Sequence, residues 1–418
     1  MKISLLNDSF PPLIDGVANT VVNYASVLQA NGHEVSVVTP RHPEENDAAY
    51  PYPVIRYPGM DMRKLTGYIA GYPFSAQVQQ ALIHEEPELL HSHCPFVSTM
   101  VARTAAKALR VPLVMTYHTK FDVDISRVVK LKLAQEGMLR ALVDNINACD
   151  EVWTVSRGAG ENLRAIGYDG DYYVMENGVD IPKGRLPEKT VQALTGNTEI
   201  PPGVPVYLFV GRMMWYKGIR MVLDALAALK SRDFDFRMVF IGKGADEEEI
   251  RQYTGLLNLT DKVIFLGPVY DREVLSAWYC RADLFLFASS YDTNGLVVRE
   301  AAACSLPSVL IKGSCAAEGV TEGRNGFLVE ENAASLAVCL ASIQAKPEWL
   351  YEVRGHVADD LYISWEDAVL KAAERYQIVI DNYKCGRYPA HTRMTDEFYQ
   401  LHGDLMEIIA KLSQREEE

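Results

Sequence analysis

Short apolar runs alternate with longer segments of helical period along most of the chain. The runs are bounded by glycine, proline or polar residues, which is typical of buried strands in a parallel sheet. In the first half of the chain the predicted strands are 2–6, 34–39, 89–91, 112–117, 151–155 and 172–175. In the second half they are 206–210, 237–241, 263–266, 284–287, 308–311 and 326–329. Because strands that alternate with helices form parallel sheets with helices on both faces, this pattern predicts an α/β fold.

Proline and glycine interrupt the alternation at 181–185 and again at 200–203, with a polar stretch between them. We therefore expect two Rossmann-like domains, 1–185 and 200–370, followed by C-terminal helices at 371–418. A chain of 418 residues, 48% of them hydrophobic, is long enough for two separate cores. Near its end, apolar residues at helical spacing predict one more packed amphipathic helix. These residues are Phe398, Leu401, Leu405, Ile408, Ile409 and Leu412.

The composition limits the classes of partner. The 41 Lys and Arg residues are outnumbered by 55 Asp and Glu, and the resulting net charge of −14 opposes any general affinity for nucleic acid or anionic lipid. No stretch approaches the roughly 20 apolar residues of a membrane span, and the N-terminus turns polar at Asn7, too early for a signal peptide. We expect a cytoplasmic protein, in which only a local basic patch could contact the inner face of the cell membrane.

Two carboxylates, Asp292 and Glu300, follow the predicted strand 284–287 and are the most informative feature of the sequence. Asp292 is expected in a strand-to-helix loop, because the helical pattern resumes near Val298. The first backbone N–H groups of that helix should favour a phosphate; they belong to Asn294, Gly295, Leu296 and Val297. Carboxylates beside a phosphate suit a nucleotide diphosphate sugar, because its rings supply hydroxyl groups that need acceptors.

The segment from Asp292 to Glu300 resembles the glutamate-x7-glutamate motif of the retaining glycosyltransferases of family four, although Asp292 stands where that family usually has Glu. Seven other segments are similar to motifs of the same family and fall in the same order along the chain. They are 10–17, 30–35, 91–93, 116–119, 177–180, 210–212 with 217–218, and 265–267.

This resemblance implies the GT-B fold, in which two Rossmann-like domains face a central cleft and the last helix crosses back to the first domain. The segment from Trp365 through 371–381 is similar to that crossing. The family's activity is transfer of a hexosyl group, here expected to be glucosyl, from a nucleotide diphosphate sugar with retention of configuration. The resemblance implies a UDP-sugar donor, a lipid or sugar acceptor, the leaving phosphate as base, and no metal cofactor.

The resemblance also implies residue roles. Arg212 and Lys217 would bind the diphosphate, while Asp292 would contact the transferred sugar and Glu300 the nucleotide ribose. His118 would face the reacting sugar, and it completes the expected catalytic set of His118, Arg212, Lys217 and Asp292. The expected donor-binding set is Gly16, Arg212, Lys217, Gly242, Val269, Asp292, Asn294, Gly295, Leu296, Val297 and Glu300.

Simpler structural roles stay open for the same residues. Arg212 and Lys217 also fit surface cations, Gly16 a turn, Asp292 a helix cap and His118 a buried structural histidine.

Metal binding has weaker support in the sequence. His91 and His93 alternate on a strand without a third ligand nearby. Two Asp-x-Asp strings, 122–124 and 233–235, do not follow a predicted strand at the matching position. We therefore expect protein cations and helix N–H groups to neutralise the diphosphate without a metal ion.

The acceptor is indicated less directly. Residues 15–20 and 117–121 resemble the subgroup that glucosylates diacylglycerol, and the basic, apolar stretch 125–143 follows. This stretch fits a helix at a membrane surface, but it fits a core helix with long cationic side chains equally well. A transferase for a soluble sugar or a polysaccharide is the alternative, and a non-catalytic nucleotide-sugar binding protein is the second alternative.

Overall fold

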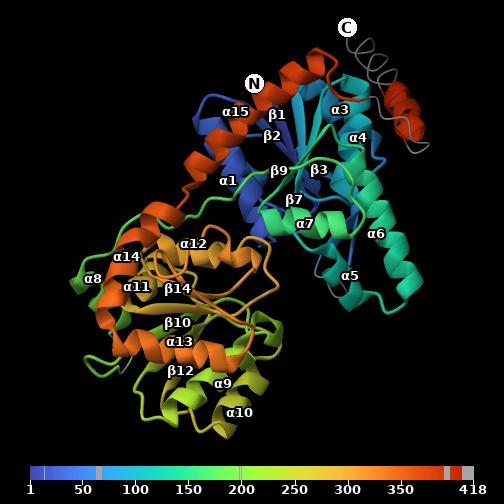
Figure 1. The fold of residues 1–418 in the computed structure, drawn as a ribbon. Helices are drawn as coiled ribbons and strands as arrows, with labels where there is room; N and C mark the ends of the chain where they lie inside the picture. Colours follow the sequence, from blue (N-terminus) through green and yellow to red (C-terminus); the bar gives the residue numbers. More distant parts are fainter. Residues whose placement is uncertain (14, 63–67, 197, 199, 390–395, 407–418) are drawn as a thin grey trace. The chain divides into compact units, whose positions relative to one another are not determined.

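The computed structural model describes residues 1–418 with the exception of 14, 63–67, 197, 199, 390–395 and 407–418 (Figure 1). The chain divides into two compact units. Unit 1 comprises Met1–Asn177 and Trp365–Glu418, and unit 2 comprises Gly178–Ser364. The boundaries between the units therefore fall after residues 177 and 364. The boundaries predicted from the sequence were 185, 200 and 370.

Unit 1 contains a seven-stranded parallel sheet with the strand order β3-β2-β1-β6-β7-β8-β9. Its strands are β1 (Lys2–Leu6), β2 (Glu34–Pro40), β3 (Val54–Tyr57), β6 (Leu89–Ser92), β7 (Leu113–Tyr117), β8 (Glu151–Thr154) and β9 (Tyr173–Val174). The sequence predicted six of them but not β3, nor the small antiparallel hairpin of β4 (Gly59–Asp61) and β5 (Ile69–Gly71). All three residues of β4 are exposed, so that strand has no apolar run to reveal it.

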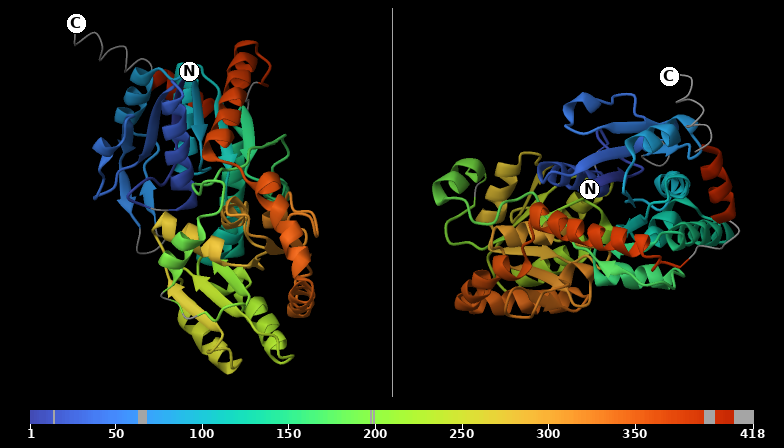
Figure 2. Two further views of the ribbon diagram at one scale, coloured as in Figure 1. Left: turned by 90° about the vertical axis from the view of Figure 1, so that its left-hand side faces the viewer. Right: turned by 90° about the horizontal axis from the view of Figure 1, so that it is seen from above.

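Helices cover both faces of the sheet in each unit, as three views of the ribbon show (Figure 1, Figure 2). In unit 1, α1 (Gly16–Ala30) and α15 (Trp365–Lys384) pack on one face. The other face is covered by α3 (Ala76–Glu85), α4 (Val97–Leu109), α6 (Lys132–Asn147) and α7 (Arg157–Ala165). Unit 1 also contains two short elements, η1 (Asp47–Ala49) and α5 (Phe121–Val128).

The expected return of the last long helix to the first domain is confirmed by α15, which lies beside α1 (Figure 1). Tyr376 of α15 stacks on Trp153 of β8 with 5.2 Å between ring centroids, and its hydroxyl lies 2.5 Å from His91 Nδ1. The preceding residue, Arg375, adds an ion pair in which its guanidinium lies 2.7 Å from a Glu151 carboxylate oxygen. These contacts join the helix to two strands of the sheet.

The predicted final helix is present, but the face predicted to pack is wrong at the three predicted positions that the structure describes. A helix is present at 396–406, but the side chains expected to pack are exposed, with Phe398 at 53%, Leu401 at 71% and Leu405 at 50%. The opposite side packs instead, because Arg103 of α4 forms a buried ion pair with Asp396 at 2.9 Å and lies over the Tyr399 ring. The other predicted positions, Ile408, Ile409 and Leu412, lie outside the described residues.

Unit 2 contains a six-stranded parallel sheet with the order β12-β11-β10-β13-β14-β15. All six strands were predicted. They are β10 (Val206–Val210), β11 (Arg237–Ile241), β12 (Val263–Gly267), β13 (Leu284–Phe287), β14 (Ser308–Ile311) and β15 (Phe327–Val329). Helices α9 (Ile219–Lys230), α10 (Glu247–Leu256) and α13 (Ala333–Ala345) share one face (Figure 1). The other face carries α8 (Glu188–Thr195), α11 (Arg272–Arg281), α12 (Leu296–Ala303) and α14 (Pro347–Leu361), and the short turns are η2 (Trp215–Lys217) and η3 (Cys315–Ala317).

Each sheet has one point at which the strand order reverses. The reversal falls between β1 and β6 in unit 1, and between β10 and β13 in unit 2. Ligands of open α/β sheets bind beside such a point, at the carboxyl ends of the strands. The loops that follow these four strands are therefore the places to look for a functional site.

All seven cysteines lie in the described part of the chain, and each is a free thiol. Within that part, none of the helices has the length and apolar character needed to traverse a bilayer.

Candidate functional site

The loops after β10 and β13 bring a lysine and an aspartate together in unit 2. Lys217, at the end of η2, places Nζ 2.5 Å from Oδ1 of Asp292. Both side chains are mostly buried, with 11% and 19% of their surface exposed. The second carboxylate oxygen, Asp292 Oδ2, is buried and has no hydrogen-bond partner among the described residues, and the same is true of Asn294 Nδ2. Because buried polar atoms are nearly always paired, an unpaired acceptor and an unpaired donor in one loop indicate a place for a ligand.

A glycine determines how closely these two loops approach. Gly218 has φ +76°, and a Cβ at this position would lie 1.8 Å from the carbonyl oxygen of Ala288, directly after β13. Only glycine permits this approach, and the approach sets Lys217 beside Asp292. Gly242 is similarly constrained, because a Cβ there would lie 2.0 Å from the Gly211 carbonyl oxygen. Gly242 therefore has a packing role that is sufficient to explain it.

Arg212 also belongs to this loop cluster. Its guanidinium carbon lies 5.8 Å from the centroid of the Tyr216 ring, and Lys217 Nζ lies 5.5 Å from the same centroid. Arg212 is exposed, whereas Lys217 is buried and paired with a carboxylate. The structure thus brings both predicted phosphate ligands to one aromatic ring.

Among the described residues, no side chain caps the N-terminus of α12. Its N-cap is Gly295, in the left-handed conformation with φ +62°, so Asp292 does not cap the helix and that structural alternative is wrong. The first N–H groups of a helix have no acceptor within it, and they carry a partial positive charge. Leu296 and Val297, which open α12, are half-buried, and Val269 packs at the edge of the core. Their predicted contact with a donor stays a prediction.

Glu300, one turn into α12, is held by two partners that the sequence did not indicate. Arg272 of α11 donates to Oε1 at 3.1 Å, and the buried Tyr279 hydroxyl donates to Oε2 at 2.9 Å. The side chain is only 12% exposed, and burial raises its pKa against the opposing effect of Arg272. Arg272 also forms an ion pair with Asp180 at 3.0 Å. Glu300 is therefore a fixed, buried carboxylate rather than a surface helix residue.

In unit 1, Gly16 opens α1 directly after the loop that follows β1. The N-cap is Asp15, whose Oδ1 accepts from the backbone N–H groups of Val17 at 2.8 Å and Ala18 at 2.7 Å. A Cβ placed on Gly16 would meet no atom of the described residues within 4 Å. The fold itself therefore gives no reason for glycine at this position, which disfavours the turn explanation.

His118, after β7, is buried and hydrogen-bonds another histidine. Its Nε2 lies 3.0 Å from Nδ1 of His93, and burial lowers the pKa of His118 to about 3. His91 points elsewhere: its ring nitrogens pair with the hydroxyls of Tyr376 and Thr116. The sequence treated His91 and His93 only as weak metal candidates, and the described residues contain no cluster of three potential metal ligands.

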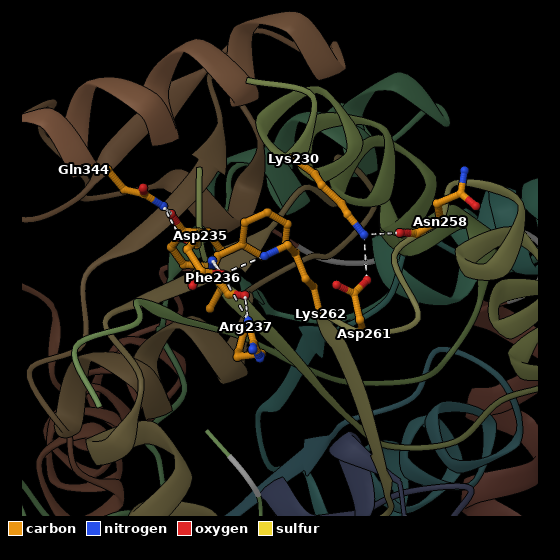
Figure 3. Close-up of polar contacts among 9 residues, drawn as sticks. Lys230, Asp235, Phe236, Arg237, Asn258, Asp261, Lys262 and Gln344 are labelled. Atoms are coloured by element: carbon orange, nitrogen blue, oxygen red, sulfur yellow. Dashed lines mark hydrogen bonds and ion pairs between the residues drawn. The ribbon is translucent and has the colours of Figure 1, made fainter. Parts of the chain in front are cut away.

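The second Asp-x-Asp string has a structural explanation. Asp235 Oδ1 accepts from Lys262 at 2.6 Å and from Arg237 at 3.1 Å, at the N-terminal ends of β11 and β12 (Figure 3). Ligand loops lie at the opposite, carboxyl edge of a parallel sheet. In the first string, Asp122 of α5 accepts from Asn162 at 3.2 Å.

The stretch 125–143 is not one helix. It spans the end of α5, a break at 129–131 and the first part of α6. Ile125, Leu142 and Val143 are buried in the core, whereas Leu131 and Leu133 are 68% and 76% exposed beside the exposed Lys130 and Lys132. Near both ends of the stretch, side chains pack into the core, as expected for a core helix. Between them, residues 130–133 expose two leucines and two lysines.

Similar proteins agree with this architecture. Anabaena Alr3699/HepE, solved in complex with UDP, superposes with a TM-score of 0.73 at 20% identity, over 90% of this chain and 100% of that chain. This likeness establishes the GT-B fold. Two family models also match the chain: Glycosyltransferase Family 4 at residues 14–183, and Glycosyl transferases group 1 at residues 204–345. The chain therefore belongs to the family-four glycosyltransferases, which use nucleotide sugars.

Two relatives illustrate the range within the family. An alpha-monoglucosyldiacylglycerol synthase of Acholeplasma laidlawii is 27% identical over 365 residues, 84% of this chain and 90% of that protein. A GDP-mannose-dependent alpha-mannosyltransferase of Corynebacterium glutamicum is 26% identical over 371 residues, 88% of this chain and 84% of that protein. The names of the two relatives differ in the sugar, and only the first names an acceptor, so the family alone fixes neither for this chain.

Proposed function

We propose that the protein transfers a glucosyl group from UDP-glucose, with retention of configuration, to a hydroxyl of a diacylglycerol-type lipid. The observation that carries the donor half is the unpaired, buried Asp292 Oδ2 beside the Lys217–Asp292 ion pair and the uncapped start of α12. This arrangement offers an acceptor for sugar hydroxyls and donors for phosphate within one loop cluster.

The diphosphate is assigned to three kinds of hydrogen-bond donor. They are the planar guanidinium group of Arg212, the ammonium group of Lys217, and the first backbone N–H groups of α12, where the helix dipole is positive. Together they neutralise the charge that develops on the leaving group, so the reaction is proposed to need no metal ion. The ribose is assigned to Glu300, whose two oxygens are oriented by Arg272 and Tyr279.

The chemistry follows from what these groups supply. The bond between the anomeric carbon and the phosphate oxygen breaks while the cations hold the diphosphate. The acceptor hydroxyl attacks from the same face, and the departing phosphate oxygen takes its proton. Asp292 stabilises positive charge on the sugar ring, and His118 is assigned a hydrogen bond to a hydroxyl of the transferred sugar.

The lipid acceptor is supported by a relative and by a surface. The Acholeplasma laidlawii protein described above is named an alpha-monoglucosyldiacylglycerol synthase. The α5–α6 tip, defined as 130–133, exposes two leucines beside two lysines. Leucines that enter the acyl region and lysines that meet anionic headgroups are what a peripheral membrane contact requires.

The donor and acceptor are tested in sequence. Hydrolysis of UDP-, GDP- and ADP-sugars identifies the donor, and transfer to dioleoylglycerol vesicles is then compared with transfer to soluble sugars. The anomeric configuration of the product, read by NMR, tests retention. Hydrolysis of GDP-mannose alone, or a product of inverted configuration, would contradict the corresponding part of the proposal.

Sedimentation with phosphatidylglycerol vesicles tests the α5–α6 tip. Full burial of a leucine is worth about 1.5–3 kcal/mol and a lysine near an anionic surface about 1 kcal/mol. Replacing Leu131 and Leu133 by Ser should therefore reduce binding more than tenfold, and replacing Arg127, Lys130 and Lys132 by Ser should also reduce it. Leu256→Ser is the matched control, because this leucine of α10 is 79% exposed in unit 2. Equal binding of all variants would favour the soluble acceptor.

A further inference from the structure

The loop after β6 places His93 beside the point where the strand order of unit 1 reverses. Gly16 follows β1 on the other side of that point, whereas His118 follows β7, one strand further away. Since ligands of open α/β sheets lie beside the reversal, the topology gives His93 a more central place than His118.

The His93 ring is buried and fixed in one orientation. The residue is only 2% exposed, its backbone N–H donates to the Leu6 carbonyl at 2.8 Å, and its ring centroid lies 4.0 Å from that of His91. Tyr24 of α1 contacts the same ring edge-on at 5.3 Å. Nδ1 is used, because it lies 3.0 Å from His118 Nε2. Nε2 is buried and has no partner among the described residues.

The chemistry of the pair defines what can occupy Nε2. Burial lowers the pKa of His93 and of His118, so both rings are neutral near pH 7. Each neutral ring carries one proton, and the contact between them needs one donor. His93 Nε2 is therefore an acceptor when its own proton sits on Nδ1, and a donor when His118 supplies the shared proton. A hydroxyl group satisfies either state, whereas a carboxylate or an ammonium group satisfies only one.

We propose that His93 Nε2 hydrogen-bonds a hydroxyl group of the acceptor. His118 holds the His93 ring in place through the contact between its own Nε2 and His93 Nδ1. This inference rests on the proposed function, because it takes the ligand of unit 1 to be a hydroxyl-bearing acceptor. His93 acts as a hydrogen-bond partner here and removes no proton.

Two amide variants separate the nitrogens of the ring. An asparagine amide reaches the position of Nδ1, and a glutamine amide reaches that of Nε2. The assay is transfer from UDP-glucose to dioleoylglycerol in vesicles, with the acceptor KM as the readout. We expect His93→Gln to stay within about threefold of the unmodified protein and His93→Asn to raise the acceptor KM at least about tenfold, the loss of roughly one hydrogen bond. The reverse order, or an equal KM in both variants, would overturn the assignment of Nε2.

Two controls exclude a general loss of structure. His84→Gln changes an exposed histidine of α3 and should leave every parameter unchanged. Calorimetry with UDP should give the same Kd for all variants, because Arg212, Lys217 and Glu300, to which the diphosphate and the ribose are assigned, lie in unit 2, whereas His93 lies in unit 1. A weakened UDP Kd in the His93 variants would overturn the inference, because the substitution would then disturb more than the acceptor contact.

Failure of the proposed function has a different signature. If the unmodified protein ignores dioleoylglycerol but transfers to methyl α-D-glucoside, the lipid assignment fails and the same KM comparison is made with the glucoside. Independently of turnover, long-range 15N spectra of the histidine-labelled chain should show His93 and His118 neutral, with one proton shared at their contact. A charged ring, or rings that do not share a proton, would overturn the inference.

Discussion

Replacing Gly16, the first residue of α1, by alanine is expected to lower activity without lowering stability. A methyl group added at Gly16 would have no neighbour within 4 Å among the described residues, and the helix is already capped by Asp15, whose Oδ1 accepts from backbone N–H groups at 2.8 and 2.7 Å. Alanine is therefore accommodated without displacing any neighbour. Alanine in a helix is more stable than glycine by roughly 0.5–1 kcal/mol in the interior, and by less in the first turn. Gly16→Ala should leave the thermal midpoint of unfolding unchanged or slightly raised.

The same methyl group should impair the reaction. If glycine is needed so that a phosphate or a sugar hydroxyl can approach the backbone, the extra carbon displaces that group and removes a hydrogen bond. A hydrogen bond to a charged group is worth about 1.5–3 kcal/mol, which corresponds to a loss of more than about tenfold in kcat/KM. The assay is hydrolysis or transfer with the donor identified in the sugar screen, beside thermal unfolding of the same preparation.

Gly355→Ala is the matched control for this substitution. Gly355 lies inside α14, and a methyl group there also has no neighbour within 4 Å in the part of the chain that the structure describes. It should be as stable as Gly16→Ala or more so, with full activity. Full activity of Gly16→Ala would refute the argument, because the glycine would then have neither a structural nor a ligand-binding reason. A lowered thermal midpoint would refute it differently, by showing that the site is not open.

Three further predictions concern unit 2. Arg212→Ala should weaken UDP binding by about 1.5–3 kcal/mol in calorimetry without lowering the thermal midpoint, because Arg212 is exposed; unchanged affinity would exclude it as a phosphate ligand. Burial raises the pKa of Glu300, so its ionised form destabilises the fold above that pKa, and the penalty is relieved as the pH falls through it. UDP affinity should fall as the pH is lowered through the same range, which lies above 4.5, because the protonated carboxyl group is a poorer hydrogen-bond acceptor. Glu300→Gln should abolish this pH dependence of UDP affinity. A pH profile shared by both proteins would contradict the assignment of Glu300 to the ribose. Turnover should survive EDTA, and a loss restored by Mg²⁺ or Mn²⁺ would show that a metal ion is required.

The sheets could be predicted from the sequence because most of their strands are continuous apolar runs. The predicted bounds of β1, β10, β11, β13 and β14 agree with the structure. Strand β3 was missed because Arg56 interrupts its apolar residues between two prolines. Its guanidinium is buried against the carbonyls of Pro11 and Pro40 and the carboxylate of Asp47. Those partners lie outside the strand, so no local pattern could show that an arginine belongs in it.

The packing face of the final helix was predicted wrongly for a related reason. The helical spacing of its apolar residues predicts a helix, which is present at 396–406, but this spacing cannot show which face of the helix the rest of unit 1 covers. The buried pair of Arg103 and Asp396 decides that, and it joins residues from α4 and from 396–406. A buried charge pair fixes orientation strongly, since either charge left alone in the core would be costly.

The sequence indicated Lys217 and Asp292 separately, one for phosphate and one for the sugar, but it could not show that they touch. Their contact at 2.5 Å has a physical reason, because neither charge could remain mostly buried by itself in the free protein. Under the proposed function, a donor sugar would offer each of them a second partner. The diphosphate would attract the lysine, and a ring hydroxyl would meet Oδ2 of the aspartate, which has no hydrogen-bond partner among the described residues. The ion pair thus orients both side chains before the ligand arrives. A simple sugar or an inorganic phosphate alone would satisfy only one half of the pair and leave the other half with its original partner, which favours recognition of a molecule that carries both.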